Sequence, residues 1–469
     1  MERLAMGDLN GIDQAGTVPA TARLNDTVIR DDRTLGHSMR VTAFCAGLTC
    51  VLVSGFALGA PAVQTHGNPV PPEPAVVHTG MHQSMLPAAR VDAALKDYDH
   101  WLDQLAQENR TAGLATAVVV NDKVRYERTL GYADANTGAK VQPDTVFRLA
   151  SLSKAFATAL TGLLVRQGTL SWDTRLASVL PFFSLRDANA SQEATVRDIL
   201  SQSIGLPHNA YDNLLSNGVP YQELERKLDT VPLTCDPGSC YGYQNIAFSL
   251  IGDVIYAKTG QFFSQLVDKY LFLPLGMTTA SYGRDSLENS RSWARPHYEH
   301  GKQWVSYEPN DNFYIPPAAG VNASIRDMEQ WLIAQMGGRP MVLPDALLDV
   351  LHAPIIDTPS ERMFSNWRRA RVKHASYGLG WRVYDYAGET LIFHAGAVKG
   401  YRSMIGFFPK YHAGVVVLWN CESNTPAGLM PMLLDDLLGL PHEDWAELDR
   451  PDHPARSSPR RVRRAKRKH

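Results

Sequence analysis

The chain contains 469 residues, of which 44% are hydrophobic and 20% are charged, and its formal net charge is −2. This composition excludes a disordered chain, a collagen and a coiled coil, because the apolar fraction is ordinary and the charged fraction is low. Only one stretch is long and apolar enough to cross a bilayer, so a multi-span membrane protein is excluded as well. The length leaves room for one large domain with a substantial buried core.

The first predicted element is an apolar segment near the N-terminus. Residues 41–60 carry no charge, which is typical of a signal peptide or an uncleaved membrane anchor; a buried core helix is the alternative. The residues before it mix acidic and basic side chains, unlike the start of a signal peptide, so we hypothesise that translation begins at Met39. We therefore expect an N-terminal extension over 1–38, a signal peptide or anchor over 39–62, a linker over 63–86, and a periplasmic or other extracytoplasmic location.

Helix and strand patterns follow this linker. Apolar residues recur on one face of residues 88–109, the spacing of an amphipathic helix. Two apolar runs, 115–120 and 124–130, flank Asn121-Asp122, and this arrangement predicts a β-hairpin. Residues 152–165 are strongly apolar and predict a buried helix.

Strand patterns return only near the C-terminus, over residues 390–393, 403–408 and 415–419, while the middle of the chain is mostly helical in pattern. Early and late strands around a helical middle predict one sheet built from both ends of the chain. The expected fold class is α/β (α+β), an antiparallel sheet flanked by helices plus a mostly helical subdomain. The expected domain covers residues 87–445, with the sheet subdomain from about 87–155 and 365–445 and the helical insertion over about 156–364.

A basic tail closes the sequence. Eight Lys or Arg residues and no acid lie between Arg456 and Lys468, and subtracting these eight charges from −2 leaves −10 for the chain before them. We expect residues 446–469 to be a disordered, solvated basic tail with no specific partner, and contact of the tail with an anionic surface is the alternative. Aromatic residues do not interleave with these charges, so we expect no nucleic acid partner.

Two cysteines, in the segment Cys235-Asp-Pro-Gly-Ser-Cys240, enclose a turn. In an oxidising compartment they could close a small loop worth about 2 kcal/mol, and two free thiols are the alternative. The sequence has no HExxH motif and no His or Cys pairs at ligand spacing, so we expect no metal and no cofactor.

The first candidate catalytic motif, Ser151-Leu-Ser-Lys154, lies where the apolar helix begins. One helical turn separates the two residues, so the amine can reach the hydroxyl, and the helix start adds unpaired backbone N–H groups. A lysine accepts the serine proton only if burial or a neighbouring cation lowers its pKa from about 10.4. Taken alone, a capping serine followed by a surface lysine is the commoner explanation of this pattern.

The second candidate motif is Tyr243-Gln-Asn245, which precedes another apolar helix. A tyrosine can relay a proton as a general acid or base, and an asparagine amide can orient a lysine or a substrate carbonyl. By itself the motif is nearly uninformative, because both residue types also cap helices and close turns.

The third candidate motif, His394-Ala-Gly396, directly follows the apolar strand 390–393. The glycine would let a substrate lie along the strand, and the N–H group of Ala397 would serve as an oxyanion donor. His394 would donate a hydrogen bond or a partial positive charge to the substrate. A strand-end histidine with one structural hydrogen bond is the alternative.

In this order, the three motifs resemble those of the serine β-lactamases and penicillin-binding hydrolases, within them most the class C β-lactamase, D-alanyl-D-alanine carboxypeptidase and related esterase branch. Further family-like stretches lie at residues 195–207, 274–277, 319–324 and 377–381, so the resemblance covers roughly residues 90–440. It implies a β-lactamase/transpeptidase-like fold. Lys258-Thr259-Gly260 spells the family's third motif literally, but it ends a predicted helix, where glycine is a usual C-cap.

The resemblance also implies a mechanism. Ser151 would attack a carbonyl group while Lys154 and Tyr243 accept and transfer the proton of its hydroxyl group. The backbone N–H groups of Ser151 and Ala397 would hold the oxyanion, and Asn245 would position the acyl chain. Water would then hydrolyse the acyl-enzyme.

The sequence departs from the class C β-lactamases at His394, where lysine is usual. A histidine is mostly neutral at pH 7 and is a weaker anchor for a substrate carboxylate. Lys399 or Arg402, shortly downstream, could compensate.

We therefore expect a serine hydrolase that acts through an acyl-enzyme on Ser151. The leading substrates are β-lactams or D-Ala-type peptide amides, either as small molecules or as peptidoglycan-type peptides. One alternative is a carboxylesterase with the same machinery. Another is a penicillin-binding module that is acylated without turnover.

Overall fold

The computed structural model describes residues 85–309, 313 and 315–448. Several predictions lie outside these residues, namely the signal peptide or anchor at 41–60, the start at Met39, and nearly all of the N-terminal linker and the basic tail. Among the described residues, no helix combines the length and the apolar character that crossing a membrane requires.

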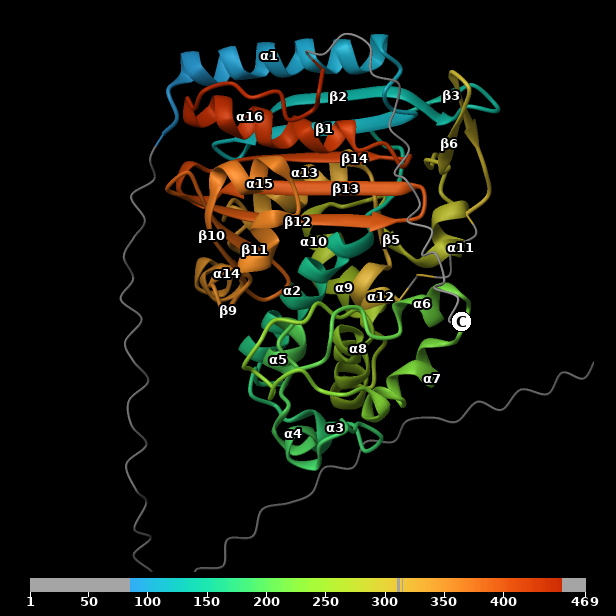
Figure 1. The fold of residues 1–469 in the computed structure, drawn as a ribbon, viewed down its shortest axis with the longest axis vertical. Helices are drawn as coiled ribbons and strands as arrows, with labels where there is room; N and C mark the ends of the chain where they lie inside the picture. The colour runs from blue at the N-terminus through green and yellow to red at the C-terminus, as the bar shows by residue number, and fades with distance from the viewer. Residues whose placement is uncertain (1–84, 310–312, 314, 449–469) are drawn as a thin grey trace, which may run out of the picture. The chain divides into compact units, whose positions relative to one another are not determined.

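One large antiparallel sheet takes strands from both ends of the chain (Figure 1). Within the described part of the chain its strand order is β3-β2-β1-β14-β13-β12-β11-β10-β9. The bounds are Gly113–Val120 (β1), Lys123–Asp134 (β2), Ala139–Lys140 (β3), Ile356–Asp357 (β9), Val372–Tyr377 (β10), Arg382–Tyr386 (β11), Glu389–Val398 (β12), Tyr401–Phe408 (β13) and Ala413–Trp419 (β14). The predicted fold class is confirmed, because β1 pairs with β14 along its length, from Leu114 opposite Trp419 to Val120 opposite Ala413.

Helices cover both faces of this sheet, as the alternation of buried side chains along β1 requires. Leu114, Val118 and Val120 join a core with the helices Ala88–Gln107 (α1) and Leu429–Leu438 (α16). Ala115, Ala117 and Val119 join a second core with Ser153–Arg166 (α2) and Ile325–Gln335 (α13). Every residue of β1 is therefore buried.

The predicted elements at the two ends of the chain are confirmed. The helix expected over 88–109 is α1, and the buried helix expected over 152–165 is α2. Asn121 and Asp122 have φ values of 53° and 58° and form the tight turn between β1 and β2. The three late strand predictions fall within β12, β13 and β14.

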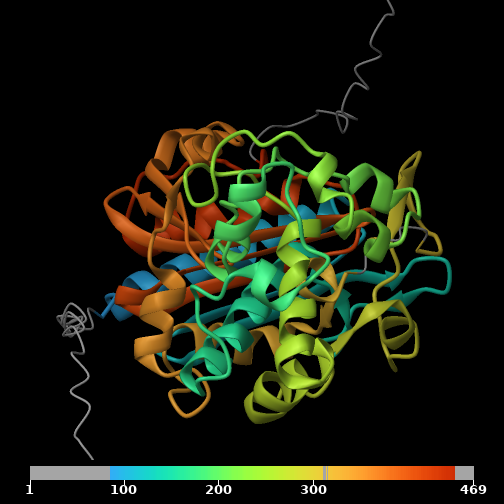
Figure 2. The ribbon, with the colours of Figure 1, turned by 90° about the horizontal axis from the view of Figure 1, so that it is seen from below.

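The helices of the middle segment lie below the sheet in Figure 1 and in front of it in Figure 2, which is seen from below. They are Leu176–Val179 (α3), Ala188–Glu193 (α4), Val196–Leu200 (α5), Asp212–Ser216 (α6), Tyr221–Glu225 (α7), Ile246–Thr259 (α8), Phe263–Val267 (α9), Leu273–Leu275 (α10), Gly283–Glu288 (α11) and Pro316–Ala319 (α12); Asp345–His352 (α14) and Asn366–Arg371 (α15) follow α13. Short helical turns include Ala150–Leu152 (η1) and Pro359–Met363 (η4).

The middle segment also contains short strands. Ser281–Tyr282 (β5) and Val321–Ala323 (β8) form a small sheet with Phe147–Arg148 (β4), and His297–His300 (β6) forms a hairpin with Gln303–Ser306 (β7). Two to four residues are too few to produce a recognisable alternation, which explains why these strands were not predicted.

Candidate active site

Ser151 lies where two segments far apart in the sequence meet. It occupies η1, which leads into α2, and Ala150 before it has a φ of 48°, a left-handed conformation that costs a non-glycine residue about 1–3 kcal/mol. Gly396 of β12 packs directly against this turn. A Cβ atom on Gly396 would lie 2.2 Å from the carbonyl oxygen of Leu149 and 3.1 Å from the backbone nitrogen of Ser151. Glycine is therefore needed for the third motif to approach the first.

Lys154 is completely buried, one helical turn after Ser151. Its Nζ atom lies 3.4 Å from Ser151 Oγ. The same atom donates hydrogen bonds to Asn245 Oδ1 at 2.6 Å and to the carbonyl oxygen of Ala318 at 3.1 Å. The structure thus brings together the first motif and the asparagine of the second.

The surroundings of Lys154 favour a neutral amine. Burial lowers its pKa well below the usual value; Asp212 opposes this shift and Arg382 adds to it. The Nζ atom also lies 4.7 Å from the ring centroid of Tyr243. A neutral amine has two N–H groups, and both have the acceptors described above, so its lone pair can face Ser151 Oγ.

Tyr243 keeps its proton at neutral pH. Burial raises the pKa of its phenol to about 12, although Arg382 and a hydrogen bond with Ser151 act in the opposite direction. A protonated phenol beside the serine hydroxyl can donate a proton but does not act as a resting base. The protonated state of Tyr243 is evidence on which residue is the acylation base, a question that the motifs alone left open.

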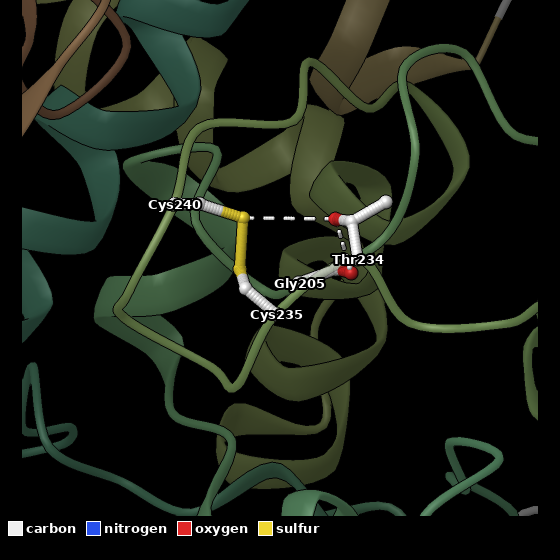
Figure 3. The surroundings of a disulfide bond; sticks show 4 residues. All are labelled: Gly205, Thr234, Cys235 and Cys240. Carbon is white, nitrogen blue, oxygen red and sulfur yellow. Dashed lines mark hydrogen bonds between the residues drawn. A yellow bond between two sulfur atoms is a disulfide. The ribbon is translucent and has the colours of Figure 1, made fainter.

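A disulfide between Cys235 and Cys240 closes the loop that leads to Tyr243 (Figure 3). Thr234 beside it donates two hydrogen bonds to the carbonyl oxygen of Gly205, from its N at 2.8 Å and from its Oγ1 at 3.0 Å. Further along the loop, Gly242 approaches the segment 202–206 so closely that a Cβ atom would lie 2.1 Å from the oxygen of Leu206. These contacts hold the backbone that carries Tyr243.

The side-chain amide of Asn245 is bonded at both ends. Its Oδ1 accepts from Lys154, and its Nδ2 donates to Asp212 Oδ2 at 2.7 Å. The other carboxylate oxygen of Asp212, Oδ1, is buried and has no hydrogen-bond partner among the residues that the structure describes. Asp212 lies at the start of α6 and was not predicted, because 33 residues separate it from Asn245 and no motif links them.

Both ring nitrogens of His394 face other groups of the protein. It is completely buried, its Nδ1 lies 2.9 Å from the carbonyl oxygen of Ala395, and its Nε2 lies 3.2 Å from both Tyr377 Oη and Arg382 Nη1. Burial lowers its pKa well below the usual value, and the positive charge of Arg382 adds to this shift. Protein groups therefore lie within hydrogen-bond distance of both ring nitrogens, and the expected contact between the ring and a substrate stays a prediction.

A buried ionic network supports this histidine. Arg382 Nε donates to Glu361 Oε2 at 3.1 Å, and Arg368 Nη1 donates to the same oxygen at 2.8 Å. Burial would raise the pKa of Glu361, but Arg382 and Arg368 outweigh it, so the pKa is lowered and the carboxylate stays charged. Sequence reasoning missed Arg382 and Glu361, because a charged residue on a strand or a turn is ordinarily exposed.

The two candidate carboxylate anchors lie on the hairpin between β12 and β13. Arg402 Nη2 donates to Glu422 at 2.5 Å, and its Nη1 donates to two carbonyl oxygens of its own hairpin. Arg402 therefore already has a carboxylate partner. Lys399 is exposed and lines a surface pocket of about 500 Å³ together with His297, Tyr298, Tyr307 and Glu422, so it remains a candidate.

Two remaining sequence predictions concern backbone positions. Gly260, of the segment Lys258-Thr259-Gly260, is the left-handed C-cap of α8 with a φ of 68°, which confirms that this segment is not the third motif. Ala397 follows Gly396 on β12 and has an exposed side chain. The role of its N–H group as an oxyanion donor stays a prediction.

The sheet, the helices that flank it and the arrangement of the three motifs are those of the penicillin-binding and serine β-lactamase fold. A model of the family described as Beta-lactamase matches residues 98–438, and the protein therefore belongs to the Beta-lactamase family. The resemblance inferred from the motifs is confirmed.

Curated relatives are distant. Protein flp of Staphylococcus aureus (strain COL) is 25% identical over 333 residues, which cover 71% of this chain and 63% of the relative. The unguisins hydrolase ungD of Aspergillus violaceofuscus is 26% identical over 364 residues, with the same two coverages. The chain thus spans less than two thirds of the length of these relatives.

Two solved structures share the fold. The octameric penicillin-binding protein homologue from Pyrococcus abyssi has a TM-score of 0.65 at 21% identity, covering 74% of this chain and 78% of its own. The crystal structure of SurE has a TM-score of 0.60 at 22% identity, covering 76% and 78%. At these identities the likeness concerns the fold alone.

Proposed function

We propose that this protein is a serine hydrolase that forms an acyl-enzyme on Ser151, with β-lactams or D-Ala-type peptide amides as substrates. The observation that carries the proposal is the buried amine of Lys154, which lies 3.4 Å from the Ser151 hydroxyl and is held by Asn245. A buried lysine with a lowered pKa can take up the serine proton near neutral pH. Membership of the Beta-lactamase family supports the reaction type, and the three motifs support the substrate class.

In the acylation step, Ser151 Oγ bonds to the substrate carbonyl carbon while its proton passes to Nζ of Lys154. The backbone N–H groups of Ser151 and Ala397 are the proposed donors to the oxyanion that forms. As the C–N bond breaks, the phenol of Tyr243 gives its proton to the leaving nitrogen. The ammonium group of Lys154 then returns a proton to the phenolate, so both groups regain their starting charge.

In the deacylation step, water attacks the ester carbonyl and gives a proton to the neutral amine of Lys154. The C–O bond to Ser151 breaks, and the same proton returns to Ser151 Oγ as the carboxylic acid leaves. In this proposal His394 and Arg382 do not touch the reacting atoms. They fix β12, and with it Gly396 and Ala397, against the nucleophile.

One observation favours a carboxylesterase as the second candidate. The third motif presents a neutral, buried histidine in place of a lysine, and Glu422 already pairs with Arg402. A neutral histidine at this position binds a substrate carboxylate more weakly than a lysine would. The binding of esters that lack a carboxylate is not weakened by this change.

The test combines covalent labelling with turnover. Mass spectrometry after incubation with a penicillin or a fluorophosphonate probe is expected to find the adduct on Ser151 and none in Ser151→Ala. Ser178→Ala, which removes an exposed hydroxyl on α3, is the matched control.

The ratio of kcat/KM for a chromogenic cephalosporin to that for a p-nitrophenyl ester then separates the two candidates. Near-normal turnover by Ser151→Ala would refute the proposal, and a stable adduct without turnover would indicate a binding module.

We also propose an extracytoplasmic location. The disulfide between Cys235 and Cys240 supports it, because such bonds persist in oxidising compartments. The uncharged segment 41–60 supports it from the sequence. Fractionation of cells that produce the native chain, with N-terminal sequencing of the product, tests the location and the start at Met39 together; a reduced product confined to the cytoplasm would overturn it.

A further inference from the structure

We propose that Asp212 is a positioning residue for proton transfer at Ser151, acting through the side-chain amide of Asn245. This inference rests on the proposed function of Ser151 and Lys154. The observations behind it are a chain of contacts, the burial of one carboxylate oxygen, and the absence of another task for this side chain in the described residues.

The contacts form a continuous line into the site. Asp212 Oδ2 accepts from Asn245 Nδ2 at 2.7 Å, Asn245 Oδ1 accepts from Lys154 Nζ at 2.6 Å, and Lys154 Nζ lies 3.4 Å from Ser151 Oγ. An amide nitrogen only donates, an amide oxygen only accepts, and an ionised carboxylate only accepts. Asp212 therefore fixes which end of the Asn245 amide faces Lys154.

This orientation decides what the lysine can do. With Oδ1 toward it, Asn245 takes up one N–H group of the neutral amine, and the carbonyl of Ala318 takes up the other at 3.1 Å. The lone pair is then left for the Ser151 proton. A flipped Asn245 would present an N–H group to the amine and compete with Ser151 for that lone pair.

Asp212 as a whole is half-buried, and the fold gives no other evident reason for the burial of its Oδ1 atom. Its Oδ1 atom is buried and lacks a hydrogen-bond partner within the described part of the chain. The contacts that hold the start of α6 are made by its backbone: its N donates to the Asn209 carbonyl at 3.2 Å, and its carbonyl accepts from Ser216 Oγ at 2.9 Å. A substitution of the side chain leaves these bonds in place. Because a buried carboxylate oxygen without a partner is unfavourable, a functional reason for its burial is indicated.

The charges around Lys154 provide a second test of the proposal, because they act on its pKa. The groups that act on Lys154 from the elements packed around it are the carboxylate of Asp212 on α6, the guanidinium of Arg382 on β11, the neutral ring of His394 on β12 and the phenol of Tyr243. Of the two charges, Asp212 raises the pKa of Lys154 and Arg382 lowers it. Removing the carboxylate therefore moves the pKa of Lys154 further down.

Two variants separate the roles of the acceptor and the charge. Asp212→Ala removes both, so Asn245 loses its fixed orientation; we expect the rate of Ser151 labelling by a fluorophosphonate to fall about tenfold to a hundredfold, as for a misplaced catalytic group. Asp212→Asn keeps an acceptor of the same size without the charge. It is expected to recover most of the rate, while the acid limb of the rate against pH shifts to lower pH in both variants.

The control is Asp253→Asn on α8. Asp253 is also a largely buried carboxylate and accepts from Tyr221 Oη at 2.7 Å, away from the three motifs. We expect this variant to change the melting temperature only, with the pH limb unmoved. Asp212 variants that behave in the same way, at a normal labelling rate, would overturn the inference while leaving the proposed function intact. Absence of any Ser151 labelling in the unmodified protein would overturn both.

Discussion

The backbone of Gly396 approaches Ser151 so closely that a methyl group on Gly396 would lie 3.1 Å from the Ser151 nitrogen. This close approach places β12 directly against η1, the turn that carries Ser151. Ser403 of β13 adds to this junction, because its Oγ donates to the carbonyl oxygen of Leu149 at 2.7 Å. The nucleophile is therefore positioned by the central sheet as well as by its own helix.

Replacement of this glycine is expected to abolish activity. In Gly396→Ala the new Cβ would lie 2.2 Å from the oxygen of Leu149 and 2.3 Å from Ser403 Oγ, so β12 must move away from η1. Labelling of Ser151 should fall at least a hundredfold, since a displacement of about 1 Å has this effect on a positioned group. The double variant Gly396→Ala/Ser403→Ala relieves only one of the two clashes and is expected to stay inactive. A normal labelling rate in Gly396→Ala would contradict the role of this contact.

Removal of the Tyr243 hydroxyl is expected to affect amides more than activated esters. Since burial raises its pKa to about 12, the phenol is protonated at working pH and serves as the acid for a leaving nitrogen. A p-nitrophenolate leaves without a proton. Tyr243→Phe should lower kcat/KM for a cephalosporin or peptide by about a hundredfold or more, and for a p-nitrophenyl ester by clearly less. Tyr241→Phe, two residues away, is the control; an equal loss on both substrate types would argue against the acid role.

The candidate site contains residues that the sequence predicts and residues that it does not. Ser151 and Lys154 are one helical turn apart, and the strand before His394 is apolar, so the sequence identifies them as candidates once the three motifs are considered together. Asp212 and Arg382 act only after the chain has folded, because nothing in the local sequence separates a buried charge from a surface one. The fold divides in the same way: the long helix α1 and the strands β12–β14 carry a periodic signal, whereas two-residue strands such as β4 and β5 exist only through pairing with β8.

Because His394 is buried, a lysine at this position is expected to destabilise the protein rather than to bind a substrate carboxylate more tightly. In His394→Lys the ammonium group would lie beside Arg382, whose Nη1 is 3.2 Å from His394 Nε2. An unpaired buried charge costs about 3–5 kcal/mol. The melting temperature should fall, and turnover of a carboxylate-bearing cephalosporin should not improve at pH 8. His394→Gln, which keeps a neutral acceptor for Arg382, is the control, and improved turnover by the lysine variant at an unchanged melting temperature would speak against this placement.

The disulfide is expected to contribute to both stability and activity. Opening the loop between Cys235 and Cys240 removes a constraint worth about 2 kcal/mol on the unfolded chain. It also loosens the backbone that leads to Tyr243. The double variant Cys235→Ser/Cys240→Ser should therefore unfold at a lower urea concentration and hydrolyse amides more slowly. Cys421→Ala removes a buried thiol outside the disulfide and serves as the control; an unchanged urea midpoint after loss of the disulfide would exclude the first effect.

Acid is expected to destabilise the protein through its buried neutral histidines. Burial lowers the pKa of His352 to about 3, while an unfolded histidine titrates near 6.5. Between these values the unfolded state binds more protons, so the stability contributed by the neutral ring is complete above pH 6.5 and is lost as the pH falls, by about 1.4 kcal/mol per pH unit. His352 packs edge-on to the rings of Trp381 and Phe407, so His352→Phe keeps an aromatic ring there and should flatten the fall in unfolding free energy between pH 7 and pH 5. The exposed His374 gives the control variant His374→Gln, and an unaltered slope in His352→Phe would show that this ring is not the group that titrates.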